Sequence, residues 1–304
     1  MKSLIMIPVL SAMIILLSIL SCSKNEEKPK GSAEYISEIQ QWHQKRINNL
    51  KKEKGWLNLV GLYWLKEGEN TFGSAADNDI KFPQNAPKHI GTLFLKDSIV
   101  SVKINKNVTV THNGNLVNEM QLADDMSGNP TVLETGTLRW YIIKRGDRYG
   151  VRLRDIDAPL VKKFKDIKMF PINEDWRFEA LFKPYPQPKH ILIPTIIGTK
   201  EEDVSPGKLV FIKDGKTYTL DAIDEGDSFF IIFADETSGE ETYGAGRFLY
   251  TDKPDSTGKV ILDFNKAYNP PCVFTKYATC PLPPEGNYLK LRVTAGEKMW
   301  GKHH

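Results

Sequence analysis

The sequence predicts a mainly β protein, built from antiparallel sandwich or barrel units, with one amphipathic helix near its N-terminus. After Gly55 the chain consists of short runs of alternating apolar and polar residues, separated by turn signals such as Asn113-Gly114. Apolar residues at helical spacing are found before Gly55. The composition agrees, because 18 Pro and 22 Gly in 304 residues are typical of a globular protein rich in turns.

The chain begins with the features of a bacterial lipoprotein signal peptide, which we assign to residues 1–21. An apolar run from Leu4 to Leu20 follows Lys2, and Ser21 stands directly before Cys22. The alternative is a transmembrane helix, for which a run of about 17 residues is at the lower limit. We expect cleavage before Cys22 and anchoring of the mature chain in the outer membrane through a lipid on this cysteine.

Residues 22–31 are predicted to be a flexible tether, because no apolar residue follows Cys22 in this segment. Cys22-Ser23-Lys24-Asn25-Glu26-Glu27 resembles the Lys-plus-acidic export signal of surface-exposed lipoproteins in some Gram-negative bacteria. An ordinary linker facing the periplasm is the alternative. The sequence therefore predicts an outer membrane lipoprotein that faces either the periplasm or the cell exterior.

Charge and ligand types argue against two classes of function. A balance of 41 Lys and Arg against 38 Asp and Glu gives no strong basic excess, so we expect no nucleic-acid binding. The internal histidines are scattered singly, without an HExxH motif or paired CxxC motifs. A zinc site would need Cys272, Cys280 and a distant histidine. We therefore expect no metal and no cofactor.

The helical segment occupies residues 32–57 together with the turn that ends it. Its apolar face repeats at three- and four-residue steps through Ile36, Ile39, His43, Ile47 and Leu50. Ser32 is suited to cap the helix, and Lys51 and Lys52 lie near its negative C-terminal end.

The rest of the chain is divided into a small β unit at residues 58–126 and a larger antiparallel β domain at residues 130–300, separated near Met126 to Pro130. Phe229 to Phe233 is apolar throughout, which predicts a strand buried on both faces. The other predicted strands are Leu93–Leu95, Ile99–Ile104, Val108–His112, Leu138–Lys144, Tyr149–Arg154, Leu209–Ile212, Lys216–Leu220, Ala245–Tyr250, Val260–Phe264 and Tyr288–Ala295.

The small unit resembles the opening of a forkhead-associated domain, a β-sandwich that binds phosphothreonine. Gly73 occupies the place of the glycine in that pattern, His89 that of a histidine, and Asn113-Gly114 that of an Asn-Gly pair. Ser74 stands where the phosphate-pairing arginine is expected, so the strongest phosphate contact is missing. The resemblance implies a shared sandwich fold and argues against phosphopeptide binding.

Arg152 and Arg154 lie on one face of a predicted strand, because side chains alternate along it. They are candidates for an anion clamp. A structural pair between an arginine and an aspartate such as Asp155 is the alternative.

The segment from Lys259 to Pro284 concentrates unusual chemistry. It contains the run DFNKAYNPPC from Asp263 to Cys272 and the run CPLPP from Cys280 to Pro284. Together with Tyr243 to Arg247 and Gly55 to Leu57, these runs resemble the bacterial family called domain of unknown function 1684. The resemblance extends over nearly the whole mature chain, from the helix around Trp42 to Lys298. It implies that these residues are a family signature, without implying an activity.

The signature segment is our candidate site, since successive prolines restrict the backbone and favour a preorganised loop. A lid over a barrel mouth is the alternative. We expect a membrane-anchored extracytoplasmic protein whose β domain binds a small molecule or glycan. The pocket is predicted to be edged by Arg247, Asp263, Asn265, Asn269, Cys272 and Cys280.

Two other functions remain open at this point. One is a hydrolase that uses Asp263 as general base or Cys280 as nucleophile. The other is a structural envelope protein. An oxidising compartment favours a disulfide between Cys272 and Cys280, whereas similar family members without a secretion signal argue against it, so both the disulfide and thiol chemistry stay open.

Overall fold

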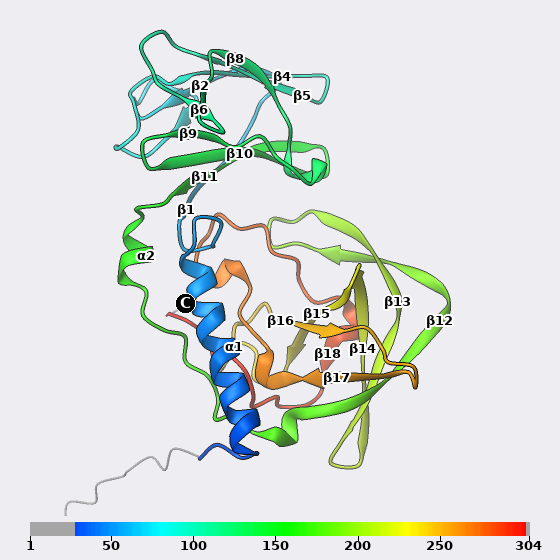
Figure 1. Cartoon of the computed structure of the whole chain (residues 1–304). Helices are drawn as coiled ribbons and strands as arrows, with labels where there is room; N and C mark the ends of the chain where they lie inside the picture. The colour runs from blue at the N-terminus through cyan, green and yellow to red at the C-terminus, as the bar shows by residue number, and fades with distance from the viewer. Residues whose placement is uncertain (1–27, 302–304) are drawn as a thin grey trace, which may run out of the picture.

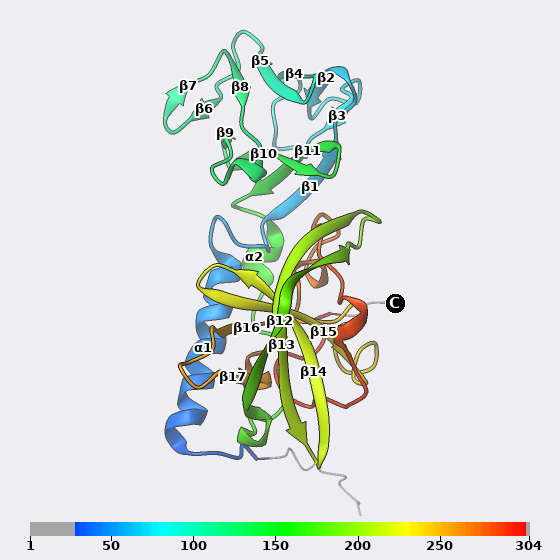
Figure 2. The same ribbon diagram turned by 90° about the vertical axis from the view of Figure 1, so that its right-hand side faces the viewer.

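The computed structural model describes residues 28–301, and it contains two β units stacked end to end (Figures 1 and 2). Within these residues, no helix is long and apolar enough to cross a membrane. The predicted signal peptide, Cys22 and most of the predicted tether lie outside the described residues. The tether ends earlier than predicted, because the Lys30 N–H donates to the carbonyl oxygen of Ile172 (2.8 Å) and the Lys30 carbonyl accepts from the N–H of Glu174 (2.8 Å).

Helix α1 (Ala33–Lys51) begins and ends close to the predicted positions. The Ser32 hydroxyl accepts from the Tyr35 N–H at 3.1 Å and caps the helix as expected. Four side chains of its apolar face, Tyr35, Ile39, Ile47 and Leu50, are buried. The helix lies along the side of the second β unit (Figure 1).

The first β unit is a sandwich of two sheets. One sheet has the order β1-β11-β10-β9-β6-β7 and the other has the order β3-β2-β4-β5-β8. The strands are β1 (Leu59–Trp64), β2 (Gly68–Gly73), β3 (Ile80–Lys81), β4 (Gly91–Lys96), β5 (Ile99–Ile104), β6 (Thr111–His112), β7 (Asn115–Leu116), β8 (Glu119–Leu122), β9 (Leu133–Thr135), β10 (Leu138–Arg145) and β11 (Arg148–Asp155).

The core of this sandwich corrects the predicted domain boundary. Phe72, Phe82 and Trp140 contact one another edge to face or at a tilt, and Val151 and Leu153 belong to the same buried cluster. Met126 to Pro130 does contain a 3-10 turn that ends at a left-handed Gly128. That turn lies inside the unit, however, because β9, β10 and β11 complete the sheet begun by β1. The sandwich therefore extends to Asp155.

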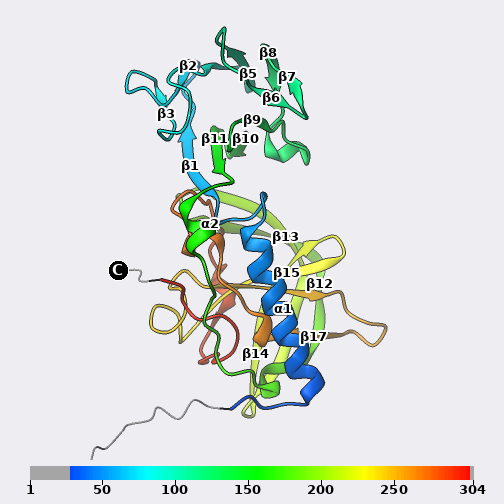
Figure 3. The same cartoon turned by 60° about the vertical axis from the view of Figure 1, so that its left-hand side comes forward.

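A connecting segment carries the chain from the sandwich to the second unit. It contains α2 (Pro159–Lys163), a short helix that begins at a proline. Figure 3 shows this segment descending beside α1 to the start of the next strand.

The second β unit is a nearly closed antiparallel barrel with the order β16-β15-β14-β13-β12-β17. Its strands are β12 (Arg177–Pro194), β13 (Lys200–Lys213), β14 (Lys216–Glu225), β15 (Ser228–Asp235), β16 (Arg247–Asp252) and β17 (Lys259–Asp263), and β18 (Tyr288–Leu289) adds to β15 in parallel. The Thr251 hydroxyl in β16 donates to the Ile261 carbonyl in β17 at 2.7 Å, which bridges the two end strands.

Side chains fill the barrel interior. Phe264 lies at its centre and contacts the rings of Trp176, Phe178, Phe211 and Phe233. These residues belong to one buried cluster with Leu209, Leu220, Ile231, Leu249 and Leu262. The interior is therefore a packed core in the manner of small barrels. Strand β15 is buried on both faces, as predicted for Phe229 to Phe233.

The predicted strand Tyr288 to Ala295 is only partly formed, because regular pairing ends at Leu289. Beyond it, the carbonyl oxygens of Val293 and Ala295 accept hydrogen bonds from the buried Arg247 side chain (3.0 and 2.5 Å). The Arg247 side chain from β16 thus donates hydrogen bonds to carbonyl groups that a neighbouring strand would otherwise pair. The alternation of apolar and polar residues gives no sign that a side chain replaces a strand here.

Candidate functional site

The signature segment begins with β17 and then runs beside α1 to the junction between the two units (Figure 1). The structure divides its predicted site residues, with Arg247, among three buried groups, each with its own partners. It does not bring Arg247 together with Asp263.

The first group joins Asp263 and Asn265 to the helix. The Tyr35 hydroxyl lies 2.9 Å from each oxygen of the Asp263 carboxylate, and Asn265 donates to the Tyr35 oxygen at 2.9 Å. The Asn265 side chain also donates to the Asn173 carbonyl at 2.9 Å. Burial, followed by the Asp263 charge, raises the pKa of Tyr35, so its proton stays in place. This network fastens α1 to β17 and leaves Asp263 turned away from solvent.

The second group surrounds Arg247, whose side chain is 0 % exposed and pairs with the equally buried Asp235 at 2.8 Å. Asp235 also accepts from the N–H and hydroxyl of Thr237 at 2.8 and 2.7 Å. Together with the hydrogen bonds from Arg247 to the carbonyls of Val293 and Ala295, these contacts hold the C-terminal segment against the barrel.

Asn269 lies near the Arg247 group, since both contact Glu297. Its N–H donates to the buried Glu297 carboxylate at 2.7 Å, and Arg46 of α1 donates both to Glu297 (2.9 Å) and to the Asn269 carbonyl (2.8 Å). The Arg46 guanidinium also lies 4.3 Å from the centre of the Tyr268 ring. Asn269 is thus part of a second attachment of α1.

The third group is the disulfide between Cys272 and Cys280, whose Cα atoms are 6.1 Å apart. Cys280 and Ala278 pack with Ile232 and Phe248 on the outer face of the barrel sheet. In this state the Cys280 sulfur is not a thiolate and cannot attack a substrate. The loop serves as a cover for this apolar face.

The disulfide should stabilise the fold measurably. It closes a loop with a sequence separation of 8, for which chain entropy predicts about 2–3 kcal/mol. We expect the Cys272→Ala, Cys280→Ala double variant to lose this amount of unfolding free energy in a denaturant titration. Detection of two free thiols in the non-reduced mature protein by mass spectrometry would contradict the bond.

A cluster of arginines lies at the junction of the two units, and it includes both members of the predicted anion clamp. Arg145 and Arg152 come from the β10–β11 hairpin, and both donate to the hydroxyl oxygen of Thr279 in the signature loop, at 3.2 and 3.1 Å. Arg154 lies on the same face of β11 and donates to the Asn58 side-chain oxygen at 2.8 Å. We call Arg145, Arg152, Arg154, Thr279 and Glu201 the junction cluster.

Arg152 is more deeply buried than Arg154, its neighbour on the same face of β11. Its residue is 4 % exposed, and its Nε atom has no hydrogen-bond partner among the described residues. The Trp56 ring centre lies 5.7 Å from its guanidinium carbon and 5.6 Å from that of Arg154. Burial lowers the pKa of Arg152, so desolvation of this charge outweighs the neighbouring groups that favour it.

The two carboxylates nearest the cluster pair with Arg145, and neither pairs with Arg152 or Arg154. Asp125 pairs with Arg145 at 2.8 Å, and the Glu201 carboxylate lies 3.5 Å from Arg145 Nε. In the part of the chain that the structure describes, the hydrogen-bond partners of Arg152 and Arg154 are neutral oxygens. The expected alternative, a pair with Asp155, is not formed, because Asp155 accepts from Asn85 at 2.9 Å. The arrangement suits an oxyanion that accepts hydrogen bonds from several guanidinium groups.

The sequence alone identified Arg152 and Arg154 but missed Trp56, Glu201 and Thr279. These residues come from three segments that are distant in the chain, and they meet because the β12–β13 hairpin reaches the sandwich (Figure 2). The Ile196 N–H donates to the Cys280 carbonyl at 2.9 Å, which holds the end of that hairpin against the signature loop.

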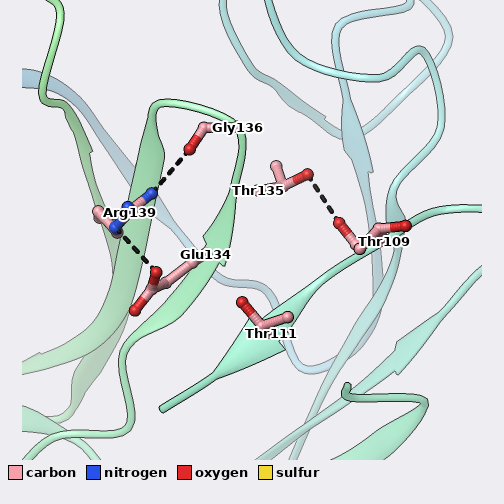
Figure 4. A pocket seen from close by; sticks show the side chains of 6 residues that line it. All are labelled: Thr109, Thr111, Glu134, Thr135, Gly136 and Arg139. Atoms are coloured by element: carbon pink, nitrogen blue, oxygen red, sulfur yellow. Dashed lines mark hydrogen bonds and ion pairs between the residues drawn. The ribbon is translucent and has the colours of Figure 1, made fainter. Parts of the chain in front are cut away.

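At the other candidate sites, the polar side chains of Arg139 and Ser74 are already paired within the protein. A pocket of about 180 Å³ in the sandwich is lined by Thr109, Thr111, Glu134, Thr135, Gly136 and Arg139. Figure 4 shows that Arg139 is already engaged by Glu134 and the Gly136 carbonyl, at 3.2 and 2.9 Å. Ser74, at the missing arginine position, donates internally to the Ala86 carbonyl. Among residues 28–301, no group of three or more His, Cys, Asp or Glu could hold a metal ion.

Comparison with known families places the second unit. The family model described as protein of unknown function (DUF1684) matches residues 162–298. The chain belongs to this family. The DUF1684 match covers the barrel and the signature segment, and it is shorter than the resemblance over nearly the whole mature chain that the sequence predicted. It contains Glu201 and Thr279 of the junction cluster, whereas the three arginines lie in the sandwich before it.

Solved structures give further likenesses to this DUF1684 protein. An uncharacterised protein of Haloarcula marismortui, solved by NMR in solution, is 31% identical over 46% of this chain and 80% of that chain, with a TM-score of 0.39. An FhaA FHA domain, solved with the intracellular domain of another protein, is 19% identical over 31% of this chain and 97% of that chain, with a TM-score of 0.21. TM-scores this low add nothing to the fold described above. No curated protein matches the chain.

Proposed function

We propose that the chain is a membrane-anchored extracytoplasmic lipoprotein whose two β units together bind a small anionic molecule or acidic glycan at the junction cluster. The observation that carries this proposal is Arg152, a buried guanidinium with an unpartnered Nε atom and no carboxylate partner among the described residues. Burying a charge is costly unless it is paired. A buried guanidinium that contacts the signature loop and has no carboxylate partner among the described residues therefore favours a role in binding.

Access to the cluster is provided by its outer members. The side chains of Arg145 and Glu201 are 15 % and 39 % exposed. Rotation of these two side chains would admit a small oxyanion to Arg152 without opening either core. The interior side chains of the barrel, in contrast, pack against one another.

The proposed hydrolase alternatives lack comparable support. Asp263 is hydrogen-bonded to Tyr35 and Asn265, and Cys280 is joined to Cys272. Both groups stabilise the fold, so we do not assign a catalytic role to either.

The binding proposal is tested by thermal unfolding with millimolar inorganic phosphate, sulfate, citrate or glucuronate, and with glucose as the neutral control. We expect at least one anion to raise the melting temperature and glucose to leave it unchanged. Arg148→Met is the matched control variant, because Arg148 is an exposed residue of the same strand that stacks on Trp64. It should retain the anion effect. A melting temperature that no anion raises would contradict the proposal.

The anchoring part of the proposal has its own prediction. The Cys22→Ala variant cannot receive a lipid on this thiol, so it should move from the membrane fraction to the soluble fraction after cell lysis. Immunoblotting of both fractions measures the outcome. Continued membrane association of Cys22→Ala after a high-salt wash would rule out the lipid anchor.

A further inference from the structure

Glu201 is the unusual member of the junction cluster, because a carboxylate repels an anionic ligand. Its Oε1 atom is buried and has no hydrogen-bond donor among the described residues. It faces Arg145 at 3.5 Å, beyond hydrogen-bond distance in the described arrangement. Glu202, the next residue, is exposed and pairs instead with His190.

An ionised carboxylate can only accept hydrogen bonds. Arg152 Nε is a donor without an acceptor, and Glu201 Oε1 is an acceptor without a donor. The two residues share neighbours, since Arg145 contacts both the Thr279 hydroxyl and Glu201, and a terminal nitrogen of Arg152 contacts that hydroxyl. A ligand that satisfies both must offer an acceptor to Arg152 and a donor to Glu201, and an oxyanion that keeps an O–H group does this while its charge suits the guanidinium groups.

We infer that Glu201 makes the junction selective for a protonated oxyanion, namely hydrogen phosphate, over sulfate. This inference rests on the proposed function. Inorganic phosphate keeps at least one proton at neutral pH and can donate it to Glu201 while its other oxygens accept from Arg152 and Arg145. Sulfate has no proton at this pH, so its oxygen would meet the Glu201 carboxylate with like charge and no hydrogen bond.

The same geometry distinguishes free phosphate from its esters. The phosphate group of a monoester loses its last proton with a pKa of about 6, so near neutral pH this group mostly has no O–H to donate. It should therefore bind more weakly than inorganic phosphate near neutral pH and approach it as the pH falls.

The protonation of Glu201 sets the pH dependence. Its neighbours are the cations Arg145 and Arg152 and the carboxylates Asp125 and Asp203. Burial raises the pKa of Glu201; Asp203 and Asp125 add to this effect and the two arginines oppose it. As the pH falls, Glu201 gains a proton and becomes a donor. Sulfate should then bind, whereas phosphate binding should change less.

The experiment is isothermal titration of inorganic phosphate, sulfate and glucose 6-phosphate into the wild type, Glu201→Gln and the control Glu202→Gln. Near neutral pH we expect wild type and Glu202→Gln to prefer phosphate over sulfate by at least about 100-fold, because the site rejects a ligand that lacks the hydrogen it accepts. The glutamine amide of Glu201→Gln offers an N–H donor, so the preference should fall below about tenfold.

The outcomes separate the two proposals. Equal affinity of the wild type for phosphate and sulfate would overturn the selectivity by Glu201 and leave the anion site intact. If neither anion binds, the inference fails, and the proposed function fails with it when citrate and glucuronate also leave the melting temperature unchanged. A second measurement needs no variant: sulfate affinity of the wild type should rise as the pH is lowered to about 5, toward the ordinary range of a glutamate. A sulfate affinity that stays flat over this range would also overturn the inference.

Discussion

Replacement of Arg247 by Met is expected to lower the free energy of unfolding by about 3–5 kcal/mol. The methionine fills most of the volume but removes the charge that pairs with Asp235 at 2.8 Å, where both side chains are wholly buried. The carbonyls of Val293 and Ala295 lose their donors at the same time. Leaving buried acceptors and a buried carboxylate unpaired is among the most costly single changes in a core.

Denaturant unfolding followed by circular dichroism measures this loss. The matched control is Arg292→Met, because Arg292 pairs with Glu240 and Glu241 at the surface, where its side chain is 44 % exposed. Such surface pairs contribute about 0–1 kcal/mol, so the control should remain close to the wild type. An Arg247→Met variant as stable as the control would show that Arg247 does not hold the C-terminal segment against the barrel.

Replacement of Arg152 by Met is expected to have the opposite sign in the absence of anions. Arg152 is as deeply buried as many core residues, yet its hydrogen bond goes to the neutral Thr279 hydroxyl, and its Nε has no acceptor. Substituting a buried charge by a hydrophobic residue of similar size removes its desolvation cost. The free energy of unfolding should therefore equal or exceed that of the wild type, by up to about 2 kcal/mol.

The comparison of Arg247 and Arg152 separates a structural from a functional arginine. Both are buried, and burial lowers the pKa of both. Only Arg247 has a carboxylate at hydrogen-bond distance among the described residues. A loss of several kcal/mol in Arg152→Met without anions would place Arg152 in the same structural class.

Local features of the fold were predictable from the sequence. The turns at Asn113-Gly114 and Asp214-Gly215 have the positive φ values that their residue types favour, and Ser32 caps α1 as its type suggests. The apolar run of β15 identified a strand buried on both faces. In each case the residues that decide the structure are neighbours in the chain.

The candidate site was less predictable, because it depends on contacts between distant segments. Asp263 meets Tyr35 across 228 positions, and that contact makes a predicted site residue part of the attachment of α1. Arg152 meets Thr279 across 127 positions. Alternation along β11 placed two arginines on one face, but the lack of a carboxylate at hydrogen-bond distance from them among the described residues emerges only from the packing of the two units.

The domain boundary shows the same limit. Met126 to Pro130 carries a genuine turn, which local residue types indicate. Whether the strands after it belong to the preceding or the following core is decided by tertiary packing. Trp140 places them in the sandwich through its contacts with Phe72 and Phe82.

The most direct test of the anion site is isothermal titration of inorganic phosphate into wild type, Arg152→Met and the control Arg148→Met. We expect saturable binding to the wild type and to Arg148→Met, and a loss of affinity of about 100-fold or more in Arg152→Met, because a buried charged partner is removed. Folding of the variant is verified by its circular dichroism spectrum. Equal phosphate affinity in the wild type and in a folded Arg152→Met protein would contradict a binding role for the junction cluster.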